Sequence, residues 1–157
     1  MAKSFLNNPN YSRGLRNNNP GNLVYTNITW AGKVPKSLNK DANQKFEQFY
    51  ELRYGIRALM RDLISDVAKP GQNTLIGLIH SYAPAFENDT TAYINSVAKS
   101  VGISPNAKIE LTEQSLVVMC KAIIYVENGA ANAKLITDAD YNDALAILGK
   151  NLKKKKA

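Results

Sequence analysis

The sequence predicts a mainly α protein of the α+β type, with four to five helices and a small lobe of loops and short β pieces. Apolar residues recur at helical spacing in five segments beyond residue 50, whereas the first 44 residues are rich in Asn, Gly, Pro, Ser and Thr. A chain of 157 residues with 45% hydrophobic residues is long enough to bury one core. We therefore expect one globular domain, in which an irregular N-terminal part precedes a helical part.

The N-terminal part contains turn signals rather than helical periodicity. Short β-type stretches at 23–25 and 29–30 lie among asparagines and glycines. Loops and a small sheet are the expected structure up to about Gln44.

Three helices are predicted next along the chain. The first covers 54–67, where apolar side chains recur every three or four residues before Pro70-Gly71. The second covers 75–82. The third starts at Asp89-Thr90, because both residue types cap helix N-termini, and it ends at Gly102.

Two further helices complete the predicted core. Thr112 opens the fourth helix, whose apolar run from 116 to 126 is the longest in the chain. A helix with so many apolar residues is expected to be central. A last amphipathic segment, 139–148, ends at Gly149.

Charge and cysteine content exclude several classes of protein. The net charge of +7 falls to +3 without Lys153–Lys156, so the excess belongs mainly to the C-terminal tail. That tail is either a solvated end or a tether to a polyanion such as a wall polymer, lipopolysaccharide phosphate or nucleic acid. One Cys120 and one His80 cannot form a disulfide or a conventional zinc site, so we expect neither metal nor cofactor.

Neither a transmembrane segment nor a secretory signal is expected. No stretch of about 18 apolar residues occurs, and residues 1–10 lack the apolar core of a signal peptide. A protein of this kind that acts on the cell envelope needs another component to deliver it.

Glu127 is the first candidate for acid catalysis. Leu116, Cys120, Ile123 and Glu127 are spaced by four, three and four, which places the carboxyl group on the apolar stripe in the last turn of its helix. Apolar neighbours and the negative end of the helix dipole disfavour a charged carboxylate there. A general acid in a glycosidase must hold a proton near neutral pH, and Asn128-Gly129 can end the helix beside it. The alternative is a solvated acid at a frayed helix end.

Two other polar clusters could contribute to a site. Successive asparagines in the segment 13–23 build turns, and their amides can also bind sugar hydroxyls. Glu87 is not explained by helix capping and is the second candidate acid or the partner of Glu127 in a carboxylate pair. Glu47 and Glu51 are the third choice, and solvation at a strand edge or helix start is the alternative for both.

The motif Arg13-Gly-Leu-Arg-Asn-Asn-Asn-Pro-Gly-Asn-Leu23 resembles the hallmark of a family of small phage proteins described as virion structural or lytic. The resemblance continues over roughly 13–130, through Trp30-x-Gly32, Tyr82-Ala83-Pro84 and Glu127-Asn128-Gly129. That family is similar to the lysozyme-like superfamily of peptidoglycan glycosidases, in which a glutamate ends a helix before a small residue and a glycine. The glutamate comes last here instead of first, which a circular permutation would reconcile.

The resemblance implies roles for individual residues. Glu127 would protonate the glycosidic oxygen, and Tyr93 would support the oxocarbenium-like transition state. Contacts to the sugar would come from amides and aromatic rings, namely Asn18, Asn19, Asn22, Trp30 and Tyr82. The corresponding domain would cover 13–150, between an N-terminal extension (1–12) and a basic tail (151–157).

We therefore expect a phage enzyme that cleaves bacterial peptidoglycan, as a lytic transglycosylase or a muramidase. It would be associated with the virion, contact other virion proteins, and act in the envelope of the host. The main alternative is a non-enzymatic virion or wall-binding protein with the same fold. A nucleic-acid-binding protein that uses Lys153–Lys156, or a wall peptidase, is a weaker alternative.

Overall fold

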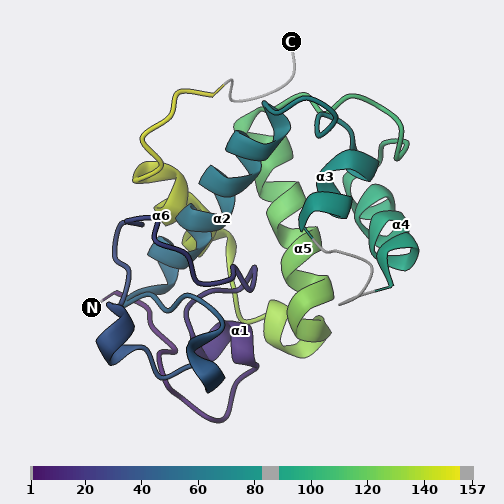
Figure 1. Cartoon of the computed structure of the whole chain (residues 1–157). Coiled ribbons are helices and arrows are strands. Elements are labelled where there is room, and N and C mark those ends of the chain that lie inside the picture. The colour runs from purple at the N-terminus through teal and green to yellow at the C-terminus, as the bar shows by residue number, and fades with distance from the viewer. Residues whose placement is uncertain (1, 83–88, 153–157) are drawn as a thin grey trace. The chain divides into compact units, whose positions relative to one another are not determined.

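The computed structural model describes residues 2–82 and 89–152, and it is mainly helical (Figure 1). Glu87 and Lys153–Lys156 therefore lie outside the described residues. The α-helices are α1 (Arg13–Arg16), α2 (Leu52–Val67), α3 (Leu75–Tyr82), α4 (Thr90–Val101), α5 (Glu113–Ala133) and α6 (Asp138–Ala146), and two short 3-10 helices cover Lys36–Leu38 and Ala42–Gln44.

The described residues form two compact units. The first consists of residues from 1–59 and 127–149, and the second of residues from 60–126 and 150–157. The first unit is therefore discontinuous in sequence, because residues from both ends of the chain build it.

The N-terminal residues belong to the first unit and contact several of its elements. The carbonyl of Lys3 accepts a hydrogen bond from the Leu52 amide at 2.9 Å, and the Phe5 amide donates to Asn18 Oδ1 at 2.8 Å. The ammonium group of Lys3 also pairs with Asp140, at 2.8 Å. These contacts tie the N-terminal residues to α2, α6 and the loop that carries Asn18 within the first unit.

The expected small sheet is reduced to isolated bridges. Among the described residues of the first unit, antiparallel bridges join Val24 to Phe46 and Lys33 to Phe49. These bridges hold the loop around Trp30 against the segment that precedes α2. The β part of the predicted α+β class is therefore a set of ordered loops.

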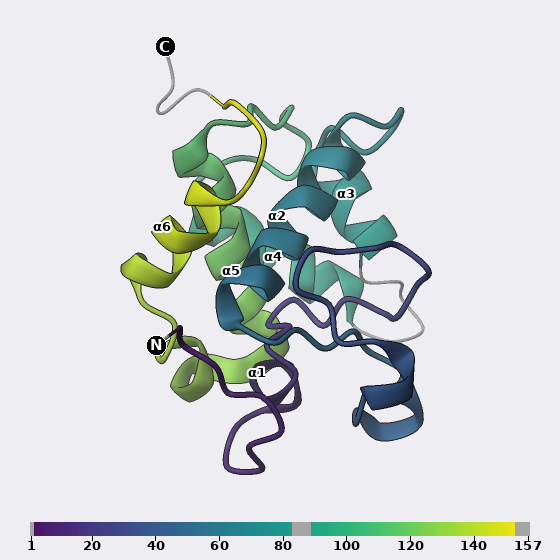
Figure 2. The same cartoon turned by 90° about the vertical axis from the view of Figure 1, so that its left-hand side faces the viewer.

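A helical core lies beneath these loops. α6 starts with a capping box, in which the Thr137 side chain accepts from the Asp140 amide and the Asp140 side chain accepts from the Thr137 amide. Figure 2 shows α6 beside the first half of α2, and the Arg57 side chain donates to the carbonyl of Ile147 at 2.8 Å. The buried apolar side chains of this unit are Leu15, Leu23, Val34, Phe49, Leu52, Ile56, Ala58, Leu59, Ile136, Tyr141, Ala144 and Leu148.

The second unit is built from helices that the sequence predicted well. α3 has the predicted bounds, and α4 begins after Asp89, whose side chain accepts from the Ala92 amide at 3.1 Å. Gly102 ends α4 with φ 78°, as a C-terminal glycine does. α3 and α4 pack side by side.

Cys120 lies in the core of this unit. Its side chain is fully buried, and this burial raises the pKa of the thiol well above its ordinary value. A thiolate nucleophile is therefore disfavoured at this position. Within the described residues, none of the helices combines the length and the apolar character that crossing a membrane requires.

Candidate functional site

The loop from Ser12 to Leu23 is built around one short helix. Ser12 caps α1 by accepting a hydrogen bond from the Leu15 amide at 3.3 Å. Asn18 and Asn22 both have φ near 51°, a left-handed conformation that asparagine tolerates better than most residues. These two positions turn the chain back on itself after α1.

Most of the asparagine side chains in this loop bond to the protein itself. The Asn18 amide donates to the carbonyl of Phe49 at 2.9 Å and accepts from Phe5. Asn19 donates to the carbonyls of Leu23 and Glu47 at 2.9 and 3.0 Å. Both side chains are 0% exposed. In this structure the bonding groups of Asn18 and Asn19 hold the loop, and the expectation that these side chains bind sugar stays a prediction.

An ion pair fixes the other side of α1. Arg13 donates to both carboxylate oxygens of Asp41 at 2.9 Å, and Asn17 donates to Oδ1 of Asp41 at 2.9 Å. Burial alone would raise the pKa of Asp41, but the hydrogen bonds from Arg13, Asn17 and the Phe46 amide outweigh it and lower that pKa. The carboxylate is thus held charged as a structural anchor.

Asn22 makes the contact that joins the loop to the candidate acid. Its side-chain Nδ2 donates to Oε1 of Glu127 at 2.8 Å, across 105 positions of sequence. Glu127 is half-buried on α5. Oδ1 of Asn22 is buried and has no hydrogen-bond partner within the described part of the chain. Two candidates from the sequence thus meet within the first unit, in direct contact.

Asn128, the residue after Glu127, also bonds to the loop that carries Asn22. Its Oδ1 accepts from the Ser12 hydroxyl at 2.7 Å, and its Nδ2 donates to the carbonyl of Pro20 at 2.7 Å. A Cβ added at Gly14 would overlap Oδ1 of Asn128 and lie 3.1 Å from Oδ1 of Asn22. The glycine of the Arg-Gly-Leu motif is therefore required because α1 approaches Asn22 and Asn128 closely.

Gly129 produces a break in α5 directly after these residues. It has φ 80° and ψ 166°, whereas the residues around it are helical. This region of backbone space is open essentially to glycine alone. The sequence predicted that the helix ends at Asn128-Gly129; a break is present at Gly129, but the helix resumes and continues to Ala133.

The remaining predicted residues lie elsewhere. Trp30 is half-buried in the loop between the two β bridges of the first unit. Tyr82 ends α3, and Tyr93 on α4 is 3% exposed, within the core of the second unit. The roles of these three aromatic residues stay predictions, and Glu87 is outside the described residues.

The third-choice acids are both engaged in ion pairs. Glu47 is 0% exposed, so the expectation of a solvated strand edge is wrong for this residue. Its Oε2 accepts from the Thr26 amide at 3.0 Å and from the Lys33 ammonium at 3.1 Å. Glu51 pairs with Arg53 at 2.6 Å. Glu47 thus holds the loop around residues 26–33.

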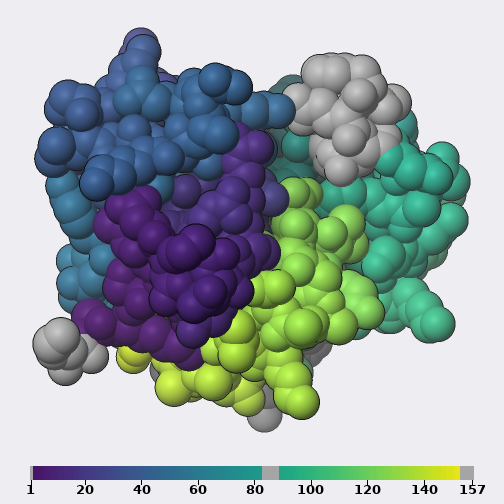
Figure 3. Space-filling model, turned by 90° about the horizontal axis from the view of Figure 1, so that it is seen from below, coloured from purple at the N-terminus to yellow at the C-terminus, as the bar shows by residue number. Residues whose placement is uncertain are grey.

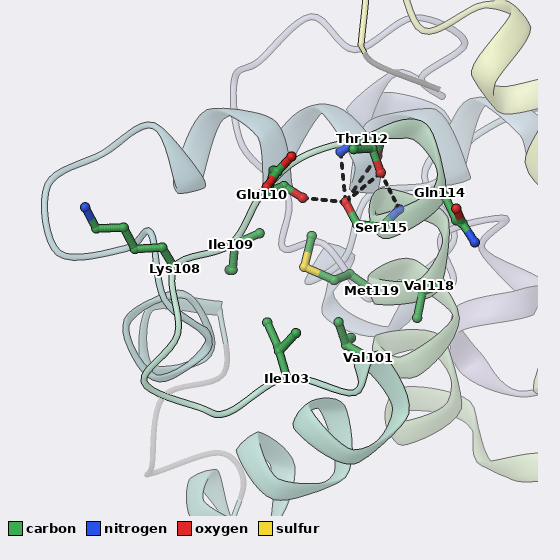
Figure 4. Close-up of a pocket in the computed structure, with 10 residues that line it drawn as sticks. All are labelled: Val101, Ile103, Lys108, Ile109, Glu110, Thr112, Gln114, Ser115, Val118 and Met119. Carbon is green, nitrogen blue, oxygen red and sulfur yellow. Dashed lines mark hydrogen bonds between the residues drawn. The ribbon is translucent and has the colours of Figure 1, made fainter. Parts of the chain in front are cut away.

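A separate pocket of about 250 Å³ lies in the second unit, and it holds none of the predicted site residues (Figure 4). Apolar side chains, among them Ile103, Ile109 and Met119, line one part of it. At its edge the Ser115 hydroxyl donates to the carbonyl of Glu110 at 2.7 Å. No group of three or more His, Cys, Asp or Glu side chains suited to a metal occurs in the described part of the chain.

Sequence reasoning missed the residues that position the site. The role of Gly14 had a signal, since a glycine between two arginines in a helical turn requires a reason. Asp41 gave no signal, because it lies 28 residues from Arg13 in a segment without periodicity. Ser12 was likewise recognisable as a helix cap but not as the partner of Asn128.

Comparison with known proteins gives one informative match. No model of a known protein family matches the chain. Protein P5 of Pseudoalteromonas phage PM2 is 38% identical over 122 residues, which cover 76% of this chain and 72% of that protein. At this identity and coverage, the chain belongs to the family of phage proteins that includes protein P5 of PM2.

Proposed function

We propose that this protein is a peptidoglycan glycosidase of a phage, with a permuted lysozyme-like fold and Glu127 as its general acid. It acts as a lytic transglycosylase or a muramidase, is carried by the virion and attacks the wall of the host. The observation that supports this best is the hydrogen bond from Asn22 Nδ2 to Glu127 Oε1, at 2.8 Å. Membership in a family of phage proteins is consistent with the proposal.

The proposed chemistry uses one carboxyl group in two states. Glu127 gives its proton to the glycosidic oxygen as the bond from C1 of N-acetylmuramic acid to that oxygen breaks. The carboxylate then takes a proton from the C6 hydroxyl or from water, and the deprotonated oxygen bonds to C1. The first route yields an anhydro sugar and the second a reducing end.

Asn22 is suited to serve both states of Glu127. Its Nδ2 donates to a carboxylate oxygen in the observed arrangement. Rotation of the amide by half a turn would present Oδ1, which can accept from a protonated carboxyl group. The buried Oδ1 has no partner in the described residues, so this rotation breaks no hydrogen bond on that side. Asn22 is therefore a positioning residue in the proposal.

Mass spectrometry of the soluble products from purified peptidoglycan tests this function. Wild type should release anhydromuramyl or reducing-end products, and Glu127→Gln should release none while it unfolds at the same denaturant concentration. Glu113→Gln is the matched control, because it makes the same change at a glutamate in the first turn of α5 that was never a candidate acid, and it should retain activity. Trp30 is the only tryptophan, so its fluorescence reports whether the first unit is folded.

Two results would contradict the proposal. Full activity of Glu127→Gln would remove this residue as the acid. The absence of products from folded wild type would favour the non-enzymatic, wall-binding alternative, which is indifferent to Glu127→Gln.

A further inference from the structure

The first unit has a polar pocket of its own, beside the loop that carries Asn22. It has a volume of about 400 Å³, and Arg16, Lys40, Asn7 and Pro9 contribute to its lining. Figure 3 shows the N-terminal segment in purple against the blue segment of the residues around 40, and the pocket is lined by these two segments. Neither the proposed acid nor its amide partner lines it.

The buried polar side chains that line this pocket already have hydrogen-bond partners within the protein. Gln48 is 1% exposed, and its Nε2 donates to Oδ1 of Asn17 and Oδ1 of Asn7, both at 2.9 Å. Its Oε1 accepts from the Lys40 amide at 2.9 Å. Asp41 is neutralised by Arg13 in a bidentate pair. These buried groups fix the walls of the pocket without requiring a ligand.

The charged groups of Arg16 and Lys40, in contrast, use few of their hydrogen-bond donors within the protein. Within the described residues, the Arg16 guanidinium makes one long hydrogen bond, to the carbonyl of Tyr11 at 3.4 Å. A guanidinium has five N–H donors, so most of its capacity remains. Lys40 is exposed, and no side-chain partner of its ammonium group occurs among the described residues. Among the described residues that line the pocket, Asp41 is the only acid, and it is paired with Arg13.

We propose that this pocket binds a carboxylate of the peptide that branches from the wall glycan. Arg16 and Lys40 carry positive charge that no acid among the described pocket residues balances, because Asp41 is paired with Arg13, so the pocket favours a small anion. The planar guanidinium of Arg16 can donate two parallel hydrogen bonds to a carboxylate. Arg16 lies two residues from Gly14, and side chains at this spacing face different sides of a helix. The glycan and its peptide would thus contact opposite sides of α1. The identity of the ligand, but not the presence of an anion site, depends on the proposed function.

The test is a binding titration with N-acetylmuramyl dipeptide, which has a free carboxylate and no glycosidic bond to cleave. Chemical shifts of the protein should move on addition of this probe, and the amidated dipeptide should bind at least tenfold more weakly. Arg16→Gln and Lys40→Gln should each weaken binding by about tenfold or more, because a hydrogen bond to a charged group is worth about 1.5–3 kcal/mol. Lys99→Gln removes a charge on α4 and should bind as wild type does.

The outcomes separate this inference from the proposed function. Glu127→Gln should bind the probe as wild type does, even though it cleaves nothing. Cleavage of peptidoglycan without binding of the dipeptide would overturn the pocket and leave the enzyme. Equal binding of the dipeptide and its amide, or tighter binding of inorganic phosphate than of the dipeptide, would overturn the assignment to a carboxylate. Unfolding followed by Trp30 fluorescence verifies that each variant is folded.

Discussion

Substitution of Gly14 by alanine tests the close approach that organises the candidate site. The added Cβ would overlap Oδ1 of Asn128. This oxygen cannot simply rotate away, because it accepts from Ser12 at 2.7 Å and the same side chain donates to Pro20 at 2.7 Å. Relief of the overlap therefore requires the loss of these contacts or a shift of α1.

The cost can be estimated from these contacts. Two hydrogen bonds contribute about 1–3 kcal/mol together, and insertion of a methyl group into a packed site costs about 1–3 kcal/mol. Alanine regains up to about 1 kcal/mol of helix propensity over glycine. The free energy of unfolding should thus fall by about 3 kcal/mol. Wall cleavage should fall as well, because Asn22 lies beside the same Cβ position.

A double-mutant cycle isolates the cause. Urea unfolding followed by Trp30 fluorescence is compared for wild type, Gly14→Ala, Asn128→Ala and the double variant. Asn128→Ala removes the side chain that the new Cβ would overlap, so Gly14→Ala should cost less than about 1 kcal/mol in that background. An equal cost in both backgrounds would refute the reasoning, since the overlap with Asn128 would then not be its source.

Three further outcomes follow from single contacts. Asn22→Ala should reduce wall cleavage about 10- to 100-fold in kcat, because one oriented hydrogen bond to Glu127 is lost. Alanine in the left-handed backbone at this position should also cost about 1–2 kcal/mol of stability. Unchanged kcat in the folded variant would contradict the positioning role of Asn22. Burial and the neighbouring Asp66 carboxylate raise the pKa of Asp62 from 3.8 to about 6. The folded protein therefore holds this proton more tightly than the unfolded chain does. The free energy of unfolding should then fall as the pH rises from about 4 to 6. Asp62→Asn should remove that pH dependence and raise the free energy of unfolding at pH 7 by up to about 3 kcal/mol. Thermal unfolding at several pH values measures both effects. An unchanged dependence of stability on pH in the variant would exclude Asp62 as its source. Gly129→Ala should cost about 1–3 kcal/mol through its backbone angles, measured by urea unfolding, and a neutral effect would show that the break tolerates other residues.

The helices could be predicted because their signals are local. Asp89 and Gly102 bound α4, and apolar spacing defines α3, so neighbours in sequence determine both elements. α1 is four residues long and shows no periodicity. The small sheet was expected from β-type residues, but the pairing of strands depends on distant partners that composition does not identify.

The candidate site was only partly predictable for a similar reason. Residue type indicated Asn22 and Glu127, which are in contact, and equally indicated Asn18 and Asn19, which are buried and bond to the protein itself. An asparagine amide bonds to a sugar or to a backbone carbonyl with the same geometry. Whether such an amide binds a sugar or a backbone carbonyl depends on which carbonyls lie beside it, such as that of Phe49 beside Asn18. The fold, and not the local sequence, determines these positions.

The order of the motifs along the chain is less informative than their contact. In the lysozyme-like glycosidases that the proposal takes as relatives, the glutamate pattern is expected before the asparagine loop, whereas here it follows. Asn22 and Glu127 nevertheless meet at 2.8 Å, and Asn128 bonds to Ser12 and Pro20 at the base of the same loop. A site that depends on such contacts survives when the chain starts at a different surface loop. Since the first unit takes residues from both ends of the chain, its geometry is compatible with either order, and the proposed acid depends on the Asn22 contact rather than on sequence position.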